Sequence, residues 1–403
     1  MDAQHQLLQR LQKPSDRKIV LVVADGLGGL PQIPDGPTEL EAAATPHLDL
    51  LAAGGVCGLH WPVLPGITAG SGPGHLALFG YDPLVYEIGR GVLSALGVAF
   101  DLHSGDVAAR GNFCTLDDRG RVTDRRAGRI ATAEAARLVE KLRRIELPDA
   151  RLFLEPVREH RFVLVLRGER LDPGVGDTDP QQTGIEPHAP KPLRSDARTT
   201  ARLVERFLGQ AHELLSEERP ANGVLLRGFS QRPDWPTLGE LHGVRACALP
   251  TYPMYRGLAR LLGMEVGVDS DADLTGQITA LEENWERFDF FFLHHKEPDS
   301  RGEDGNFVSK VSAIERLDGA MPRIQALQPD VLLVTGDHST PSRLRSHSWH
   351  PVPVLLASRT ARPDTAQRFG ESACRAGGLG LLPGKQLMAL ALAHAERLEK
   401  FGA

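Results

Sequence analysis

Asp337 and His338 are the residues of this sequence whose types and position point most directly to chemistry. They follow the wholly apolar run 331–334 after a threonine and a glycine. An apolar run of this length predicts a strand that is buried on both faces of a sheet. Open α/β sheets bind ligands just past the carboxyl ends of such strands. A carboxylate and an imidazole at this place indicate a metal site, and a Gly-Asp-His turn with an Asx hydrogen bond is the alternative.

Two other predicted strands end in the same way. The run 19–23 leads to Asp25, the run 290–293 leads to a His-His-Lys sequence and then to Asp299, and His347 precedes a further apolar run. If these strands lie side by side and parallel, their ends bring several carboxylates and imidazoles together at one edge of the sheet. Mixed oxygen and nitrogen ligands suit Mn²⁺, Zn²⁺ or Mg²⁺. Three such strand ends in one chain favour a metal site over isolated turns.

A glycine-rich loop at residues 66–74 places Ser71 just ahead of a predicted helix that begins near Pro73. Backbone N–H groups and the positive end of a helix stabilise a phosphate or a serine alkoxide at such a position. Ser71 is therefore a candidate nucleophile, and a serine that only caps the helix is the alternative. The loop lacks the Gly-Lys-Ser/Thr sequence of a nucleotide-binding P-loop.

The pattern of elements predicts two domains. Short strands and amphipathic helices at residues 104–245 indicate an inserted α+β domain. The flanking segments, residues 1–103 and 246–403, would form one split α/β domain with a mostly parallel sheet and flanking helices.

Several arginines of the inserted segment fall within or at the ends of strand-like runs, among them Arg110, Arg167 and Arg227. Arginines at such positions need partners, because a guanidinium that loses water must recover its hydrogen bonds. A phosphate or a carboxylate would supply them in bidentate geometry. The inserted domain is therefore expected to bind the anionic parts of a substrate.

The composition is that of an ordinary globular protein and argues against several classes of partner. The chain has 403 residues, of which 41% are hydrophobic and 24% charged, and its formal net charge is −6. We expect no nucleic-acid partner, since there is no basic excess, and no membrane partner, since no apolar run is long enough to span one. The four cysteines are scattered without a CxxC pair, and the N-terminus lacks the apolar core of a signal peptide, so we expect a reducing, cytoplasmic setting. The oligomeric state stays unknown.

Ten motifs together resemble one known family. They are Asp25-Gly26, Thr68 to His75, Gly105 to Phe113, Asp124 to Arg129, His160 to Gly168, Leu225 to Gly228, Thr251 to Gly257, Lys296 with Asp299, Gly336 to Pro341, and His347-Ser348. In this order, over nearly the whole chain from about Lys18, they resemble the archaeal-type 2,3-bisphosphoglycerate-independent phosphoglycerate mutases of the alkaline phosphatase superfamily.

The resemblance implies an alkaline-phosphatase-like fold that holds two divalent metal ions, Mn²⁺ or Mg²⁺, with Zn²⁺ or Co²⁺ as alternatives. It assigns one ion to Asp25, Ser71, Asp337 and His338, and the other to Asp299, His347 and the residue four positions after Asp299. Relatives carry histidine at that last position, whereas this chain has Glu303, which we predict to be the substitute ligand. This chain also has Trp349-His350 where many relatives have a small residue and an aspartate.

The activity implied is the interconversion of 3-phosphoglycerate and 2-phosphoglycerate through a phosphoserine at Ser71, without 2,3-bisphosphoglycerate. The inserted domain would close over the site and exclude water. The residues expected to bind the substrate are His75, Arg110, Arg129, Arg227, Arg256 and Lys296, with Arg126 as an alternative to Arg129. The alternative functions are a metal-dependent phosphatase or phosphotransferase of the same superfamily, and an inactive relative that only binds phosphorylated sugar acids.

Overall fold

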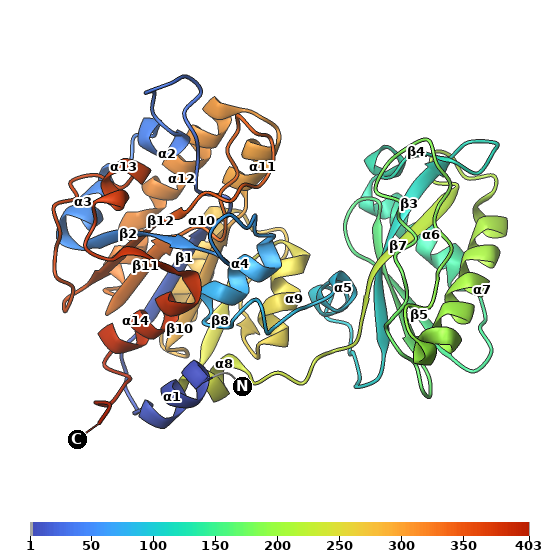
Figure 1. Cartoon of the computed structure of the whole chain (residues 1–403), viewed down its shortest axis with the longest axis horizontal. Helices are drawn as coiled ribbons and strands as arrows, with labels where there is room; N and C mark the ends of the chain where they lie inside the picture. The colour runs from blue at the N-terminus through green and yellow to red at the C-terminus, as the bar shows by residue number, and fades with distance from the viewer. Residues whose placement is uncertain (1–2, 403) are drawn as a thin grey trace. The chain divides into compact units, whose positions relative to one another are not determined.

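The computed structural model describes residues 3–402, which form two compact units (Figure 1). The first unit contains the residues up to 87 together with 236–251 and those from 262 onward, and the second contains 88–235 and 252–261. No helix within the described range is long and apolar enough to cross a membrane.

The first unit is built on an eight-stranded sheet. Every neighbouring pair of strands is parallel except the two pairs that include β12. The prediction of a mostly parallel sheet is therefore confirmed. In spatial order the strands are β13 (Gly380–Pro383), β2 (Val56–Trp61), β12 (Val352–Ser358), β11 (Val331–Thr335), β1 (Ile19–Ala24), β10 (Phe290–His295), β8 (Ala246–Ala248) and β9 (Glu265–Val266).

The strand that follows His347, β12, runs antiparallel to β11, so the condition of parallel neighbours holds for β1, β10 and β11 and not for β12. Residues 336–351 connect β11 to β12 without any helix. A parallel neighbour needs a crossover of a dozen or more residues, usually a helix, whereas an antiparallel neighbour needs only a returning loop. The loop that carries the candidate ligands therefore folds back at the edge of the sheet.

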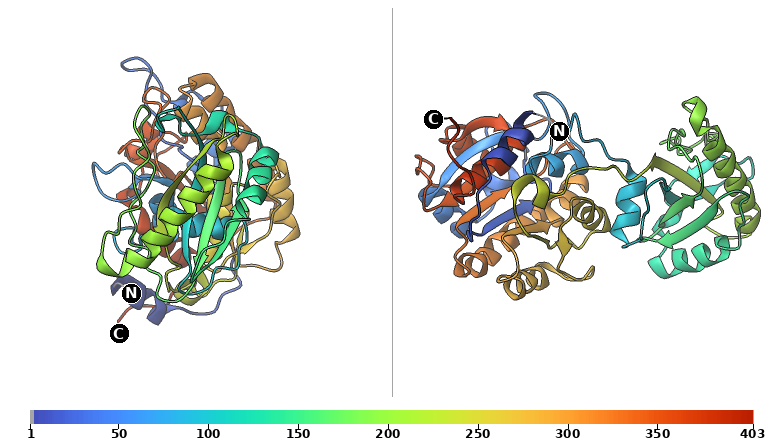
Figure 2. Two further views of the ribbon diagram at one scale, coloured as in Figure 1. Left: turned by 90° about the vertical axis from the view of Figure 1, so that its right-hand side faces the viewer. Right: turned by 90° about the horizontal axis from the view of Figure 1, so that it is seen from below.

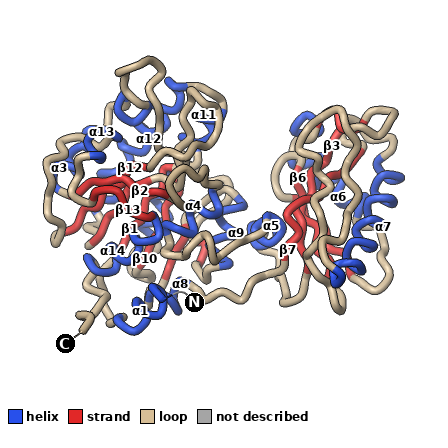
Figure 3. The backbone as a smooth tube through the Cα atoms, viewed as in Figure 1, coloured by secondary structure: helices blue, strands red, loops and turns tan. Residues whose placement is uncertain are grey.

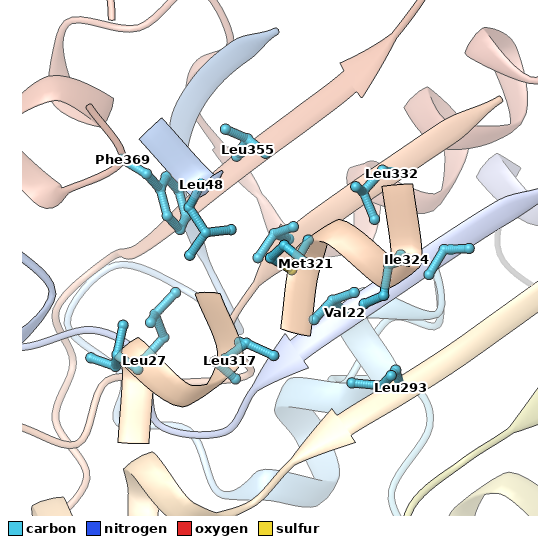
Figure 4. Packing of buried hydrophobic residues seen from close by; sticks show 14 of the residues in the cluster. Val22, Leu27, Leu48, Leu293, Leu317, Met321, Ile324, Leu332, Leu355 and Phe369 are labelled. Atoms are coloured by element: carbon cyan, nitrogen blue, oxygen red, sulfur yellow. The ribbon is translucent and has the colours of Figure 1, made fainter. Parts of the chain in front are cut away.

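Helices cover both faces of this sheet (Figure 3). Val22 of β1 lies in a core cluster with Leu317 and Met321 of α12 (Phe307–Ala326) (Figure 4). On the other face, Phe292 of β10 stacks edge-on with Phe79 after α4 (Ser71–Leu78), at 4.9 Å between ring centroids. Each such side chain contributes about 1.5–3 kcal/mol when fully buried. The helices are α1 (Ala3–Leu11), α2 (Glu39–Ala42), α3 (Pro46–Gly54), α4 (Ser71–Leu78), α8 (Leu238–His242), α10 (Leu274–Glu283), α11 (Glu297–Glu303), α12 (Phe307–Ala326), α13 (Glu371–Arg375), α14 (Leu387–His394) and the 3₁₀ turn η3 (Gly384–Gln386).

The second unit contains a five-stranded antiparallel sheet with helices on both faces (Figure 2). Val107 and Ala109 belong to the core under α6 (Thr132–Leu142) and α7 (Arg198–Leu215), whereas Ala108 belongs to the core under α5 (Arg90–Gly97). This alternation is the period of two expected of a strand that is buried on both sides. The elements are β3 (Val107–Leu116), β4 (Val122–Asp124), β5 (Arg151–Pro156), β6 (Arg161–Arg167), β7 (Gly223–Ser230), α5 (Arg90–Gly97), α6 (Thr132–Leu142), α7 (Arg198–Leu215), α9 (Pro253–Leu261) and the 3₁₀ turns η1 (Ala127–Arg129) and η2 (Ser195–Ala197).

The unit boundaries differ from the expected ones after residues 103 and 245, because α5 and α9 belong to the second unit. These two helices pack closely through glycines. A Cβ on Gly257 would lie 2.1 Å from the carbonyl oxygen of Leu93, and Arg260 donates a 2.7 Å hydrogen bond to the carbonyl oxygen of Leu96. A sequence pattern marks α9 as an amphipathic helix but does not show which sheet its apolar side contacts.

Candidate metal centre and catalytic site

The centre forms at the carboxyl ends of β1, β10 and β11. The register pairs Ala24 of β1 with His295 of β10, and Val23 with Thr335 of β11. Asp25 therefore leaves the sheet at the same level as the loops that carry Asp299 and Asp337. This is the edge at which the sequence predicted that the ligands would meet.

Asp25, Asp337 and His338 form one group of possible metal ligands, with one donor atom of each within 4.8 Å of the others. All three side chains are fully buried. His338 Nε2 lies 3.5 Å from Asp25 Oδ1 and 3.2 Å from Asp337 Oδ2, and the Ser71 hydroxyl is 3.2 Å from the same nitrogen. The structure thus brings together the four residues that the resemblance assigned to one ion.

Asp299, His338 and His347 form a second group by the same criterion. His347 Nε2 lies 3.4 Å from Asp299 Oδ1, and the rings of His338 and His347 stack at 3.6 Å between centroids. His338 therefore adjoins both groups, whereas the resemblance placed it in one. Glu303 Oε1 lies 3.9 Å from His347 Nε2, but its side chain is 58% exposed and it stands outside the group.

Lys296 and His294 bind the carboxylates of this centre. Lys296 Nζ lies 3.1 Å from Asp25 Oδ2 and also contacts Asp299, and His294 Nε2 lies 2.9 Å from Asp25 Oδ2. Burial works to raise the pKa of Asp25, but Lys296 and His294 hold that pKa well below its usual range. Burial and the charge of Asp25 likewise oppose ionisation of Asp299, yet contacts with His347 and Lys296 lower its pKa to about 2. Both carboxylates are therefore ionised at neutral pH.

The residues present fit divalent metal ions. Asp337 Oδ2 is buried and accepts no well-formed hydrogen bond from the described residues, although two imidazole nitrogens lie within 3.2 Å of it. Burial works to lower the pKa of His347, but its hydrogen bond with Asp299 raises that pKa to about 9. The buried carboxylates thus need positive charge, which the proton on His347 and the ammonium group of Lys296 supply here. A divalent metal ion would supply the same charge. Hard oxygen and borderline nitrogen donors in this proportion suit Mn²⁺, Mg²⁺, Zn²⁺ or Co²⁺.

Ser71 is the first residue of α4, and Gly70 is the N-cap. A Cβ on Gly74 would lie 2.3 Å from the carbonyl oxygen of Asp337, so only glycine lets this helix approach the ligand loop so closely. The helix N-terminus then directs the Ser71 hydroxyl at His338, where backbone N–H groups and the helix dipole favour negative charge. The glycine-rich loop predicted Ser71 just ahead of a helix that begins near Pro73, and the helix begins at Ser71 itself.

His75 does not fit its predicted role in substrate binding, because its side chain is fully buried. Its Nδ1 lies 2.8 Å from the carbonyl oxygen of Ser71 and 3.1 Å from Asp337 Oδ2. Burial opposes protonation of His75, but the charge of Asp337 raises its pKa. His75 thus supports the ligand loop from behind.

The second unit holds a concentration of positive charge, which we call the arginine cluster and define as Arg90, Arg110, Arg161 and Arg227. Arg110 of β3 and Arg227 of β7 are direct neighbours across the sheet. Burial, followed by the charges of Arg90, Arg227 and Arg161, lowers the pKa of Arg110 to about 9. The Nε atoms of Arg110 and Arg227 are buried and donate no hydrogen bond within residues 3–402, so the cluster has unused donors.

Two carboxylates approach this cluster, and both are already paired. Arg161 lies 3.0 Å from Glu159 Oε2. Asp179 lies 3.5 Å from Arg227, but it accepts two hydrogen bonds of 2.8 and 2.7 Å from Arg125. Arg167, which the sequence placed with Arg110 and Arg227, instead forms a bidentate pair with Asp106 and is structural. An anion would therefore find its donors at Arg110 and Arg227.

The remaining predicted arginines surround the same sheet of the second unit. Arg126 and Arg129 are exposed, and Arg256 is half-buried on α9. Burial and the charges of Arg161, Arg126, Arg110 and Arg129 lower the pKa of His160 to about 3. His160 is therefore neutral. The four arginines all lie close enough to His160 to disfavour its positive charge.

Three residues of the centre were missing from the predicted set: His294, Thr340 and Lys310. His294 belongs to the His-His-Lys sequence at the end of a predicted strand, so its place near the centre could have been predicted. Its hydrogen bond with Asp25 could not. Lys310 shares the buried side of α12 with Ile314 and Leu317. A lysine in the apolar phase of a helix is a signal that sequence reasoning could have used.

The comparisons with known proteins point to one family. Residues 52–222 match the family described as 2,3-bisphosphoglycerate-independent phosphoglycerate mutase. A Thermus thermophilus protein named "Probable 2,3-bisphosphoglycerate-independent phosphoglycerate mutase" is 52% identical over 403 residues, which cover 98% of this chain and 99% of that protein. A protein of the same name from Aquifex aeolicus is 48% identical over 406 residues, covering 98% and 100%.

Solved structures give the same result. The PH0037 protein from Pyrococcus horikoshii superposes with a TM-score of 0.82 at 31% identity, covering 98% of this chain and 100% of that one. The cofactor-independent phosphoglycerate mutase from Thermoplasma acidophilum superposes with a TM-score of 0.70 at 29% identity, covering 94% and 100%. The chain belongs to the family of 2,3-bisphosphoglycerate-independent phosphoglycerate mutases.

Proposed function

We propose that this chain interconverts 3-phosphoglycerate and 2-phosphoglycerate on a two-metal centre, through a phosphoserine at Ser71. The observation that carries the proposal is the position of the Ser71 hydroxyl. It lies 3.2 Å from His338 Nε2, and His338 belongs to both groups of possible ligands. A nucleophile at this place, at a helix N-terminus, is suited to accept a phosphoryl group.

The proposed ligands follow the two groups. Asp25, Ser71, Asp337 and His338 hold one ion, and Asp299, Glu303 and His347 hold the other. Mn²⁺ and Mg²⁺ are the proposed ions, because carboxylate oxygens outnumber imidazole nitrogens in this set. When bound, such ions lower the pKa of a coordinated hydroxyl and offset the charge of a transferring phosphoryl group.

Ser71 performs the covalent chemistry. Its Oγ loses its proton and forms a bond to phosphorus as the bond from phosphorus to the substrate oxygen breaks, and the freed glycerate oxygen takes up one proton, so the proton lost and the proton gained balance. Glycerate stays bound and turns, so that its other hydroxyl attacks the phosphoserine and restores Ser71. Water must be kept from the phosphoserine throughout, since hydrolysis would release phosphate and make the enzyme a phosphatase.

Lys296 and the arginines are the proposed anion-binding groups. Lys296 bridges Asp25 and Asp299, so its ammonium group lies at the metal centre, where a phosphoryl oxygen would bind. Arg110 and Arg227 carry buried donors without acceptors in the described chain, which suits a phosphate or carboxylate. Arg129 and Arg256 are proposed to assist them, with Arg126 as the alternative to Arg129.

A cytoplasmic location is part of this proposal. It rests on the use of cysteine, since Cys57, Cys114, Cys247 and Cys374 are all free thiols and all buried. Such use suits a reducing compartment.

The test is product analysis with 3-phosphoglycerate and the metal-loaded protein. We expect 2-phosphoglycerate, detected through coupling to enolase, and little inorganic phosphate. No added 2,3-bisphosphoglycerate should be needed, and labelled free glycerate should not enter the product pool. Release of phosphate as the main product would instead support the phosphatase alternative.

A further inference from the structure

Lys310 is a fully buried lysine behind the metal centre. Its Nζ donates hydrogen bonds to three backbone carbonyl oxygens, those of Gly26 at 2.9 Å, Gly28 at 3.0 Å and Thr340 at 2.9 Å. An ammonium group has three protons, so every donor is used. Burying a charge this deeply is costly, and the geometry recovers that cost only because all three bonds form together.

The three carbonyls belong to two loops that carry proposed metal ligands. Gly26 directly follows Asp25, and its N–H donates to Asp337 Oδ1 at 3.1 Å. Thr340 follows His338 by two residues, and its N–H donates to the carbonyl oxygen of Gly28 at 3.0 Å. Lys310 thus ties the loop after β1 to the loop after β11.

The side chain of Thr340 extends this connection to the second group of ligands. Its hydroxyl donates to Asp299 Oδ1 at 2.7 Å, so it must accept the 3.0 Å hydrogen bond from His338 Nδ1. This fixes the tautomer of His338 and leaves the Nε2 lone pair directed toward Ser71, Asp25 and Asp337. The residue that Lys310 holds by its backbone therefore links one ligand from each group.

Two carboxyl groups, the buried Glu39 and the half-buried Glu371, frame the same loops. Glu39 accepts hydrogen bonds from the N–H and the hydroxyl of Ser342, and Glu371 accepts one from the N–H of Gly29. Burial lowers the pKa of Lys310, and Glu39, Glu371 and Asp299 oppose this. These carboxyl groups thus offset the positive charge of Lys310 without contacting it, and its ammonium group donates only to backbone carbonyls.

We propose that Lys310 is a positioning residue that sets the spacing of the two ligand groups for metal binding. The inference rests on the proposed function, because it concerns the same centre. Lys310 touches neither a proposed ligand side chain nor the reacting atoms. It acts through the backbone of Gly26, Gly28 and Thr340.

Lys18 provides a matched control. Its Nζ also donates to backbone carbonyls, those of Trp285 and, at 3.1 Å, Phe288. It directly precedes β1 and so lies at the opposite end of that strand from Asp25. Replacing Lys18 removes bonds of the same kind without touching the ligand loops.

The experiment measures Mn²⁺ binding by electron paramagnetic resonance on the full-length wild type, Lys310→Met and Lys18→Met, together with kcat, KM and thermal stability. We expect Lys310→Met to bind at least one ion about 10- to 100-fold more weakly, the usual cost of losing a group that orients ligands. We expect its kcat to fall with little change in KM. Lys18→Met should lose stability only and keep wild-type Mn²⁺ affinity. If Lys310→Met does not fold, Lys310→Gln, which keeps a donor but loses the charge and the reach, is measured in the same way.

Two other outcomes separate the inference from the proposed function. Wild-type Mn²⁺ affinity at both sites in a folded Lys310 variant would overturn the positioning role alone. Failure of the wild-type chain itself to bind Mn²⁺ would overturn the two-metal centre and the inference with it.

Discussion

The metal centre and the arginine cluster are opposite in charge but alike in construction. The metal centre gathers Asp25, Asp299 and Asp337, whose nearby cations are Lys296 and a protonated His347. The arginine cluster gathers four guanidinium groups, whereas its nearby carboxylates include Glu159, paired with Arg161, and Asp179, which lies 3.5 Å from Arg227 and is shared with Arg125. In each region the fold brings together more charged side chains of one sign than of the other.

Other charged groups of the same chain show what completed pairing looks like. Arg167 and Asp106 form a bidentate pair, and Arg137 binds both Glu134 and Glu218. Folded proteins pair the charges that they bury, so an excess that persists marks a place where a ligand supplies the missing sign. By this reasoning the metal centre binds cations and the arginine cluster binds an anion.

The largest expected effect comes from removing the Ser71 hydroxyl, the proposed nucleophile at the metal centre. Ser71→Ala should lower kcat by about 10⁵-fold or more, because a covalent nucleophile is lost. Circular dichroism should report an unchanged fold. Ser15→Ala, which removes a hydroxyl bonded to the carbonyl oxygen of Ala395, is the control and should retain activity. Substantial mutase activity in Ser71→Ala would end the assignment of the nucleophile.

Breaking the arginine cluster should separate stability from activity. Arg110→Met should lower kcat/KM by about 100-fold, since a donor to the anionic substrate is lost. It should also raise Tm by about 2–4 °C, since relief of like-charge repulsion is worth on the order of 1 kcal/mol.

Arg167→Met is the matched control for that prediction. Its guanidinium is paired with Asp106, so its loss should lower Tm while kcat/KM changes little. A lower Tm in Arg110→Met, measured by calorimetry, would show that the cluster is internally balanced and would contradict the comparison.

Glu303 tests the composition of the second ligand group. Glu303→Ala should weaken the binding of one of the two ions by about 10-fold. Glu303→His should restore binding and shift the metal preference toward Zn²⁺ or Co²⁺, because a nitrogen ligand replaces an oxygen ligand. Isothermal titration calorimetry with each metal measures both. Asp304→Ala, at a neighbouring exposed carboxylate, is the control. Unchanged affinity for both ions in Glu303→Ala would make Glu303 a bystander.

The sequence predicted the ends of β1, β10 and β11 because apolar runs and ligand motifs are local features. It also predicted Ser71 near a helix N-terminus, since a glycine-rich loop followed by a proline is a local signal of a helix start. It did not predict the role of Lys310, whose partners Gly26 and Gly28 lie far away in the chain, or the burial of His75. Those facts depend on how helices dock on the sheet, which no local pattern records.

The smallest effect is expected at Glu218, whose carboxylate is already paired with both Arg137 and Lys141. Hydrogen bonds to Arg137 and Lys141 lower the pKa of Glu218 from 4.5 to about 2. Its ionised form therefore stabilises the fold above pH 4.5, and this contribution is lost as the pH falls toward 2. Glu218→Gln should be less stable by under about 1 kcal/mol at pH 7, and its unfolding free energy should fall less between pH 4.5 and 2. Parallel acid profiles of the two proteins from urea titrations would contradict this.

The most direct test of the account is to trap the phosphoryl group. Metal-loaded protein is mixed with ³²P-labelled 3-phosphoglycerate, quenched in acid within a single turnover, and mapped by peptide mass spectrometry. The account predicts label on the peptide that contains Ser71, with the modification on that serine, and no label in Ser71→Ala. Turnover to 2-phosphoglycerate without label on Ser71, or with label on another residue, would contradict it.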